Sequence, residues 1–459
     1  MTPPGGREGG RVQERSDTIA ALSTAPGTAA IAVVRLTGPD ARAIVTRLTG
    51  RSLPSRRAVL AAFRAPDGAT IDRGLVLYFP APHSYTGEDI VELHGHGGAI
   101  VTDWLLETLY AYGARPAEPG EFTLRAFLND KLDLAQAEAV ADLIDSGSRA
   151  AAKAALRSLD GAFSARVEQI RAGLTALRVQ VEAWLDFPDE EIDRAASDAL
   201  EASLQELLAS LRRLMAEAGV GRVLRDGVTV VIAGPPNAGK SSLLNRLAGY
   251  DAAIVTQIPG TTRDPLREHL SLDGLPVTLI DTAGLRESDD PIETEGVKRA
   301  QRELARADVV LWLMDAREGA SRAAAAARAE LGADAKPTLV LNKIDLTGEP
   351  PGAFECTGLS GLRISVRSGA GVELLTDHIK ASAGWSSEAG GTFSARRRHL
   401  DALERAAAHL EAARGRLASA LELGAEELRE AQNALGDVTG TFTSDDLLGE
   451  IFASFCIGK

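Results

Sequence analysis

The chain has 459 residues, of which 45% are hydrophobic, and this size predicts two to four domains, each with its own core. A formal net charge of -14 and an aromatic content of 4% argue against a broadly basic surface or an aromatic stacking platform for nucleic acid. The sequence shows no run of 18 apolar residues, no signal peptide and only two widely separated cysteines, so a cytoplasmic protein without a disulfide framework is expected.

The pattern of apolar residues changes four times along the chain. Residues 1–16 are expected to be a flexible tail, and residues 17–131, with 14 basic and 14 acidic side chains if the tail is included, are predicted to form one neutral α/β domain. Apolar residues recur at helical spacing over residues 132–226, and they do so again over 384–459, which begins with a Gly/Ser-rich linker. Between them, residues 227–383 alternate strands with helices, which is typical of a mostly parallel, doubly wound sheet. The predicted fold is therefore α/β multidomain, with a P-loop domain inserted between two halves of a helical domain.

Individual elements follow from the same patterns. The expected strands are residues 18–22, 30–36, 74–79 and 89–93 in the first domain, and 228–233, 277–280, 309–314, 338–342 and 363–366 in the inserted domain. The expected helices are residues 40–48, 100–112, a helical stretch that reaches about 184, 196–218 and 395–435, with a short helix at the end of the chain.

The segment from Gly234 to Ser241, GPPNAGKS, has the spacing of a phosphate-binding P-loop. It lies between an expected strand and the helix-like stretch that includes Ser242, as the motif requires. In such a loop the backbone N–H groups, including those near Ala238 and Gly239, surround phosphate oxygens. Lys240 then neutralises the β- and γ-phosphates, and Ser241 is the expected Mg²⁺ ligand.

Two further motifs indicate which nucleotide is bound. A strand-end motif of the type that responds to the γ-phosphate consists of Asp281, Thr282, Ala283 and Gly284. A second motif consists of Asn342, Lys343, Ile344 and Asp345. The Asp345 carboxylate can accept two N–H bonds from guanine, which adenine cannot offer, so GTP is predicted. The usual fifth guanine motif has alanine in the middle but is Ser365, Val366 and Arg367 here, which puts a bulkier side chain beside the base.

These motifs resemble TRAFAC-class GTPases and, more closely, the MnmE (TrmE) family of tRNA-modification GTPases. The resemblance covers nearly all of the chain from about residue 17. Besides the P-loop, its marks are IVT at 254–256, GTTRD at 260–264, the stretch from GEF at 120 to LDL at 134, and the terminal CIGK at 456–459. A G domain inserted into a helical domain is also the architecture of that family.

The resemblance implies a function. A K⁺-stimulated GTPase would add a carboxymethylaminomethyl or aminomethyl group to C5 of the wobble uridine, U34, of certain tRNAs. The one-carbon donor would be 5,10-methylenetetrahydrofolate, with 5-formyltetrahydrofolate as a related ligand. The protein would be a homodimer through its N-terminal domains, and the flavoprotein MnmG would join it in a heterotetramer. The neutral N-terminal domain and the acidic remainder suggest that this partner supplies much of the positive surface for tRNA.

The GTPase machinery departs from the Ras pattern, because Leu285 stands where a glutamine usually orients the attacking water. An acidic run follows, and the resemblance singles out Glu293 within it for that role. No arginine finger is visible in the sequence. The resemblance instead implies a K⁺ ion held by Asn237, Thr256, Ile258 and Thr261, with Thr262 joining Ser241 on Mg²⁺. It also assigns nucleotide contacts to Gln257, Pro259 and Gly260.

A second site is implied in the N-terminal domain. The resemblance assigns reduced-folate binding to Arg35, Glu92, Lys131 and Lys459, whose charges suit the glutamate carboxylates and the pterin N–H groups of a folate. The nearby HGHGG sequence at 94–98 could be a metal site, but a backbone turn whose glycines permit close approach is the preferred interpretation.

Two alternatives stay open at this stage. The chain could be a regulatory GTPase, for example in ribosome assembly, without any one-carbon chemistry. Cys456, four residues from the end, could be a packing residue or a reactive thiol. Prenylation does not fit, because Gly458 and Lys459 follow it in place of the required residues. The resemblance favours a tail that returns to the folate pocket, with Cys456 as a nucleophile or proton carrier.

Overall fold

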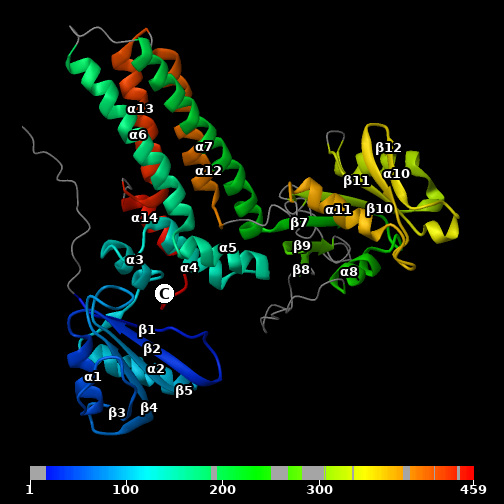
Figure 1. Ribbon diagram of the computed structural model, residues 1–459. Coiled ribbons are helices and arrows are strands. Elements are labelled where there is room, and N and C mark those ends of the chain that lie inside the picture. Colours follow the sequence, from blue (N-terminus) through cyan, green and yellow to red (C-terminus); the bar gives the residue numbers. More distant parts are fainter. Residues whose placement is uncertain are drawn as a thin grey trace, which may run out of the picture. The chain divides into compact units, whose positions relative to one another are not determined.

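The computed structural model describes residues 17–187, 194–249, 267–281, 304, 307–332, 335–385, 393–417, 419–441 and 445–458 (Figure 1). The chain divides into two units, of which one consists of residues up to 141 together with those from 436 onward. The other unit consists of residues 142–435. Each unit is described by itself below.

A six-stranded sheet forms the centre of the first unit. Its strands are β1 (Ile19–Leu22), β2 (Ala29–Thr37), β3 (Val59–Arg64), β4 (Thr70–Phe79), β5 (Ile90–Gly97) and β6 (Arg115–Pro116). Their order across the sheet is β3-β4-β5-β2-β1-β6, and only the β1–β6 pair is parallel. The sheet is therefore an antiparallel sheet with a short parallel edge.

The two faces of this sheet differ because successive side chains on a strand point to opposite sides. One face packs on α1 (Ala41–Thr49) and α2 (Ala99–Ala111), and its buried strand residues include Val34, Val76 and Leu93. Arg35 and Glu92 alternate with these core residues and therefore lie on the opposite face. The alternation thus places charged groups on the face that α1 and α2 do not cover.

Helices from distant parts of the sequence complete the first unit. They are α3 (Glu121–Leu128), α4 (Leu134–Ile144) and α14 (Asp445–Ala453). Phe452 and Phe455 of the C-terminal segment pack with Leu134 and Phe127 in one apolar cluster. The end of the chain is consequently part of the N-terminal unit, and Figure 1 shows the C-terminus beside this unit.

Long helices form one part of the second unit. They are α5 (Arg149–Leu159), α6 (Ala162–Asp186), α7 (Arg194–Asp226), α12 (Arg397–Arg416) and α13 (Leu421–Thr439). Figure 1 shows α6, α7, α12 and α13 lying side by side, and α7 contacts both α6 and α12. Leucines at helical spacing on α7, including Leu204 and Leu211, are fully buried, which is the apolar stripe that a bundle requires.

The other part of this unit is a seven-stranded sheet. Its central strands are β7 (Val228–Ala233), β9 (Leu275–Asp281), β10 (Val309–Asp315), β11 (Thr338–Asn342) and β13 (Leu359–Arg363), all parallel to their neighbours among these. Antiparallel strands β8 (Arg267–Leu272) and β12 (Gly352–Cys356) form the two edges. The helices that belong to this sheet are α8 (Lys240–Ala248), α10 (Ala320–Leu331) and α11 (Val372–Ser382).

The predicted fold class is confirmed, and the differences are local. The strands β3, β6, β8 and β12 were not expected, and the expected helix 395–435 is two helices, α12 and α13. The strand expected at 363–366 ends at Arg363, because β13 pairs with β11 only through Gly361–Arg363. Within the described residues, no helix combines the length and apolarity needed to cross a membrane.

The turn expected at residues 94–98 is wrong, because β5 continues to Gly97. The expected close approach at these glycines is confirmed. A Cβ on Gly97 would lie 2.6 Å from the Ala29 carbonyl oxygen, and one on Gly95 would lie 2.6 Å from an Asp72 carboxylate oxygen. Glycine is needed here for strand packing and for the Asp72 contact, and no chain reversal occurs.

Candidate functional site

The P-loop lies between β7 and α8 and depends on backbone conformations that favour glycine. Gly234 has φ +140°, and a Cβ on it would lie 2.1 Å from the Leu313 carbonyl oxygen on β10. Gly239 has φ +102°, and its Cβ would lie 2.4 Å from Asn342 Nδ2. Between them, Asn237 also has a positive φ, of 61°. The loop therefore turns tightly and leads the chain into the N-terminus of α8, where N–H groups at the start of the helix can bind an anion.

Lys240 is the first residue of α8 and is 7% exposed. Its Nζ donates hydrogen bonds to the carbonyl oxygens of Gly234, at 2.9 Å, and Pro235, at 3.0 Å. The ammonium group therefore lies inside the loop that the sequence predicts to hold phosphates. Phosphate oxygens are stronger acceptors for this cation than neutral carbonyl groups, so a bound polyphosphate can compete for it.

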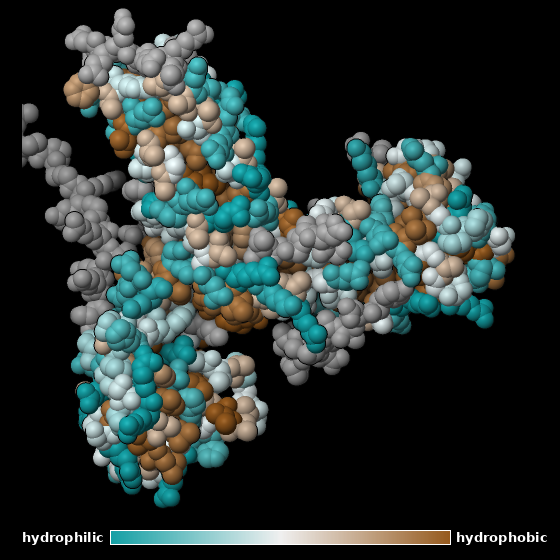
Figure 2. All heavy atoms as spheres, viewed as in Figure 1, coloured by the Kyte–Doolittle hydropathy of each residue, from teal (hydrophilic) through white to brown (hydrophobic). Residues whose placement is uncertain are grey.

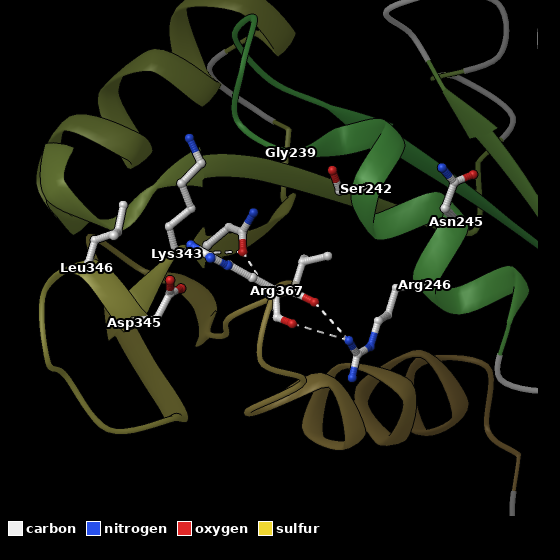
Figure 3. A pocket seen from close by; sticks show the side chains of 10 residues that line it. Gly239, Ser242, Asn245, Arg246, Lys343, Asp345, Leu346 and Arg367 are labelled. Carbon is white, nitrogen blue, oxygen red and sulfur yellow. Dashed lines mark hydrogen bonds between the residues drawn. The ribbon is translucent and has the colours of Figure 1, made fainter.

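A pocket of 620 Å³ opens beside the P-loop (Figure 3). It is lined by Gly239, Ser242, Asn245, Arg246, Asn342, Lys343, Asp345, Leu346, Val366 and Arg367. These residues come from three separate segments of the sequence, at the P-loop and α8, the end of β11, and the loop after β13. The pocket thus brings together two of the sequence-predicted guanine motifs and the phosphate loop.

Asn342 joins these three segments. Its Nδ2 donates to the Ala238 carbonyl oxygen at 2.9 Å, and its Oδ1 accepts from the N–H groups of Lys343, at 2.8 Å, and Val366, at 3.0 Å. The side chain is only 3% exposed. Because Asn342 is buried and makes all three bonds inside the protein, its role in this structure is to hold the pocket walls together.

Asp345 is exposed on the pocket side of η3 (Ile344–Leu346). Its Oδ1 accepts a 2.6 Å hydrogen bond from Ser365 Oγ, which fixes the orientation of the carboxylate. Lys343, with φ +67°, donates from Nζ to the Asn237 carbonyl oxygen at 2.8 Å and lies 3.0 Å from Asp315. Hydrogen bonding from Arg317, helped by Lys343, outweighs burial and holds the pKa of Asp315 well below its usual range.

The structure explains why Val366 can replace the alanine that is usual in the fifth guanine motif. Its side chain is 6% exposed and belongs to the core of the G domain, and its N–H is used by Asn342. Arg246 of α8 donates to the carbonyl oxygens of Val366, at 3.2 Å, and Arg367, at 3.4 Å. Sequence reasoning missed Arg246, because it stands outside every motif and acts on backbone atoms of a distant loop.

The sequence-predicted metal ligands are only partly described. Ser241 lies in the first turn of α8, and Asp281 ends β9 with a side chain that is 2% exposed. The side chain of Asn237 is exposed. Several predicted catalytic, metal or nucleotide residues lie outside the described residues, namely Thr256, Gln257, Ile258, Pro259, Gly260, Thr261, Thr262, Thr282, Ala283, Gly284 and Glu293. Among the described residues, no group of three or more His, Cys, Asp or Glu side chains could hold a metal ion.

A second polar site lies on the N-terminal sheet. Arg35 of β2 and Glu92 of β5 are register partners, and Arg35 donates from Nε, at 3.1 Å, and Nη2, at 2.8 Å, to Glu92 Oε1. The other carboxylate oxygen lies 3.3 Å from His94 Nε2. His96 pairs with Asp72 at 2.8 Å. Each histidine of the HGHGG sequence therefore contacts a different carboxylate.

Aromatic rings border this site. The Arg35 guanidinium lies 5.9 Å from the ring centroids of both Tyr85 and Phe122, within reach of a cation–π interaction. The Tyr85 hydroxyl bonds Thr123 at 2.9 Å, and burial raises the pKa of Tyr85. Neither ring was identified from the sequence, because single aromatic residues on separate segments leave no pattern.

Lys131, the third predicted folate residue, is exposed and lies shortly after the end of α3, preceded by Asp130, which has φ 53°. A buried ion network supports this region. Glu121 accepts from Arg115 and, at 3.0 Å, from Arg125. Burial raises the pKa of Glu121, but hydrogen bonds from Arg115, from the Glu118 N–H and from Arg125 outweigh it and lower that pKa. The network fixes α3 against the sheet.

The C-terminal tail lies against the same sheet. Gly120 N–H donates to the Cys456 carbonyl oxygen at 3.4 Å, and Ile457 forms a bridge with Pro119. Ser23 Oγ donates to the Gly458 carbonyl oxygen at 3.1 Å. The tail therefore follows the end of β1, the strand next to the one that carries Arg35. Cys456 is exposed, and Lys459 lies outside the described residues.

Comparisons with known proteins identify the family of this chain. Residues 18–131 match the family model described as GTP-binding protein TrmE N-terminus, and residues 134–456 match the MnmE helical domain. The tRNA modification GTPase MnmE of Alkalilimnicola ehrlichii is 55% identical over 96% of this chain and 99% of its own length. That of Nitrosococcus oceani is 52% identical over 98% of both chains. The G domain of the T. maritima FeoB iron transporter matches 34% of this chain and 98% of its own, at 26% identity and a TM-score of 0.26. This chain belongs to the MnmE family of tRNA modification GTPases.

Proposed function

We propose that this GTPase acts with a flavoprotein partner, MnmG, to add a carboxymethylaminomethyl or aminomethyl group to C5 of U34 in certain tRNAs in the cytoplasm. A reduced folate such as 5,10-methylenetetrahydrofolate would supply the one-carbon unit. The observation that carries the proposal is the identity above 50% with MnmE proteins over nearly the whole chain, including the N-terminal and helical regions.

The G domain supplies the GTP hydrolysis of this cycle. We assign the phosphates to the P-loop from Asn237 to Ser242 and the base to the pocket beside Asp345. Val366 and Arg367 line that pocket, and the buried Ser365 acts on the base through its hydrogen bond to Asp345. An Asp345 carboxylate held by Ser365 presents an acceptor for the N–H groups of guanine, which supports GTP over ATP. The proposed boundaries are residues 17–131 for the N-terminal domain, 227–383 for the G domain, and 132–226 and 384–459 for the two halves of the helical domain.

Two cations fit the chemistry of the residues. Mg²⁺ prefers hard oxygen ligands. The Ser241 hydroxyl offers one, and the buried Asp281 carboxylate offers another, because Asp281 is the register partner of Ile232 at the end of β7, directly before the P-loop. The exposed Asn237 amide offers an oxygen to K⁺. We propose that K⁺, also held by Thr256, Ile258 and Thr261, supplies positive charge to the transition state, while Glu293 orients the attacking water and Thr262 completes the Mg²⁺ shell.

The folate site is proposed around Arg35 and Glu92. In the structure these side chains neutralise each other, so a folate would have to share them, with its anionic groups approaching Arg35 and its pterin N–H groups approaching Glu92. The partly buried Tyr85 ring beside Arg35 gives a planar heterocycle apolar surface, and the Phe122 ring, which is fully buried, supports Arg35 from the core. Lys131 and Lys459 would add cationic groups, and Cys456 would act as a nucleophile or proton carrier.

A homodimer through the N-terminal domain is supported by an exposed apolar row. Leu60 and Leu75 are register partners on β3 and β4 and are 68% and 43% exposed. Leu75 is in turn the register partner of His94, so the row continues toward the proposed folate site. Figure 2 shows apolar surface interrupting the hydrophilic exterior of this domain. Leu75→Glu should therefore convert the dimer to monomer in light-scattering measurements.

The deciding experiment is nucleoside analysis of tRNA from a deletion strain that carries wild-type protein, Glu293→Ala or Cys456→Ser. Loss of C5-modified wobble uridine on deletion, with recovery only by the wild type, is expected. Unchanged modified uridine in the deletion strain would favour the alternative of a regulatory GTPase without one-carbon chemistry. Full modification with Cys456→Ser would refute the chemical role of that thiol alone.

A second experiment separates the folate site from the GTPase. Arg35→Ala and Glu92→Gln should abolish binding of 5-formyltetrahydrofolate to the purified protein and leave GTP turnover within about twofold of the wild type, because the two sites belong to different units. Arg73→Ala, an exposed position on the same sheet, is the matched control and should keep folate binding.

A further inference from the structure

The β8–β9 hairpin joins the two nucleotide-responsive segments of the sequence. It begins at Arg267, five residues after Thr262, and ends at Asp281, the first residue of the second such segment. Its turn, Asp273 and Gly274, has φ values of 51° and 91°, as a tight Asp-Gly turn between antiparallel strands requires. Whatever holds the turn of this hairpin therefore acts on both segments through two short strands.

The turn rests on the first residues of α5. Ser148 Oγ donates a 2.8 Å hydrogen bond to the Gly274 carbonyl oxygen and also accepts from the Ala151 N–H, as the N-cap of α5. The contact is close, because a Cβ on Gly274 would lie 3.2 Å from that of Ala150. Ser148 is 8% exposed, so its hydrogen bond to the hairpin is shielded from water.

Apolar packing extends this contact. Leu272, Leu275 and Val277 of the hairpin belong to one buried cluster with Ala154 of α5 and Leu224 of α7. The partly buried Ala150, Val220 and Val223 pack against the same cluster. The hairpin is therefore attached at one end to helices of the bundle and continues at the other end into the segments predicted to surround the γ-phosphate.

The far end of α5 is attached to the chain that returns to the bundle. Ser158 Oγ donates to the Ser394 carbonyl oxygen at 3.0 Å, and Ser394 Oγ lies 3.2 Å from Asp142. Asp142 also accepts from Arg225, at 3.0 Å, and Arg396, at 2.7 Å, which stand at the end of α7 and the start of α12. A displacement of α5 would thus change hydrogen bonds at the two points where the chain enters and leaves the G domain.

We propose that Ser148 is a positioning residue for GTP hydrolysis, which holds the β8–β9 turn on α5 and so couples the nucleotide state to the helical bundle. GTP binding and the contact between the β8–β9 turn and α5 then influence each other reciprocally, as coupled equilibria must. The proposal depends on GTP turnover and is independent of the folate and tRNA chemistry proposed above.

The test compares two substitutions in the full-length protein. Ser148→Asp keeps an oxygen that can cap Ala151 but removes the donor to Gly274, whereas Ser148→Thr keeps both functions. Ser148→Asp should lower kcat for GTP about fivefold and leave KM within about twofold, because one shielded hydrogen bond that positions the reacting segments is lost. In Ser148→Thr, both kcat and KM for GTP should stay within about twofold of the wild-type values.

Hydrogen exchange supplies the readout that a purely structural role would not change. In the wild type, protection of the Ala151 and Ala152 amides should differ between GDP and a non-hydrolysable GTP analogue. In Ser148→Asp that difference should disappear. Ser321→Asp, the same substitution at an exposed position in the first turn of α10, is the control and should behave as wild type.

Three results would overturn the proposal. They are unchanged kcat in Ser148→Asp, equal losses in the Asp and Thr variants, and wild-type exchange that does not depend on the nucleotide. If Ser148→Asp does not fold, Ser148→Ala replaces it, and its melting temperature separates the loss of the helix cap from the effect on kcat. Because no folate or tRNA is present, failure here leaves the proposed modification function standing.

Discussion

The nucleotide site and the charged site on the N-terminal sheet are built in different ways. The first depends on backbone, with Gly234 and Gly239 in positive-φ conformations and Asn342 spanning three segments. The second depends on side chains, with Arg35, Glu92 and His94 bonded to one another. A backbone site requires particular residues at fixed spacing, whereas a side-chain site needs only charges that the fold brings together.

The largest effect should come from a change that removes no functional group. Gly234→Ala places a Cβ 2.1 Å from a β10 carbonyl oxygen in a conformation with φ +140°, so the loop must move. Affinity for GDP should fall by about 100-fold or more, measured with a fluorescent nucleotide. Gly249→Ala, with φ −80° and no contact nearer than 3.5 Å, is the control and should bind normally. Normal binding by Gly234→Ala would refute the backbone description.

The second prediction concerns the one side chain in the nucleotide site expected to read the base. Asp345→Asn turns an acceptor pair into one donor and one acceptor, so KM for GTP should rise by about 100-fold. KM for xanthosine triphosphate, whose base has a carbonyl group in place of the guanine amino group, should fall. Steady-state kinetics with both nucleotides measure this effect. Equal KM values for GTP in the variant and the wild type would place the base elsewhere.

The third prediction tests the side-chain site through its support. Glu121→Gln leaves the buried Arg125 and the partly exposed Arg115 without their full charge partner, which should cost about 3 kcal/mol of unfolding free energy at pH 7. Because the pKa of Glu121 is lowered in the folded chain, its stabilisation is present above the unfolded pKa and is lost as the pH falls. Urea titrations should therefore show a difference that shrinks below about pH 4. Glu107→Gln, an exposed position on α2, is the control.

The smallest effect should come from Val366→Ala, which restores the alanine usual in this motif. Val366 contributes its N–H to Asn342 and its side chain to the core. We expect KM for GTP to change by less than about twofold and unfolding free energy to fall by about 1–2 kcal/mol. A large gain in GTP affinity would show that the valine side chain obstructs the base.

This contrast also explains what could be predicted from the sequence. The P-loop, the segment from Asn342 to Asp345 and the strands around them followed from local patterns, because buried parallel strands are continuous apolar runs and the loops between them have fixed spacing. The edge strands β8 and β12 were missed, because strands exposed on one side are short and mixed in composition.

The side-chain contacts were less accessible to prediction. Arg35 and Glu92 were named through a family resemblance, and nothing in their local sequence indicates that they are register partners. The rings of Tyr85 and Phe122, the Arg246 contact to the loop after β13 and the Ser148 contact to Gly274 all join residues from separate elements. Such contacts depend on tertiary packing, which periodicity and spacing do not encode.

The packing of α14 with α4 has a consequence for the order of events during synthesis. The cluster around Leu134 in the first unit includes Ile451, Phe452 and Phe455, which leave the ribosome only after the whole helical and G-domain sequence. At translation rates of about 5–20 residues per second, the apolar surface of α3 and α4 stays uncovered for tens of seconds before α14 is synthesised. During that interval the nascent N-terminal unit exposes the apolar surface that α14 later covers.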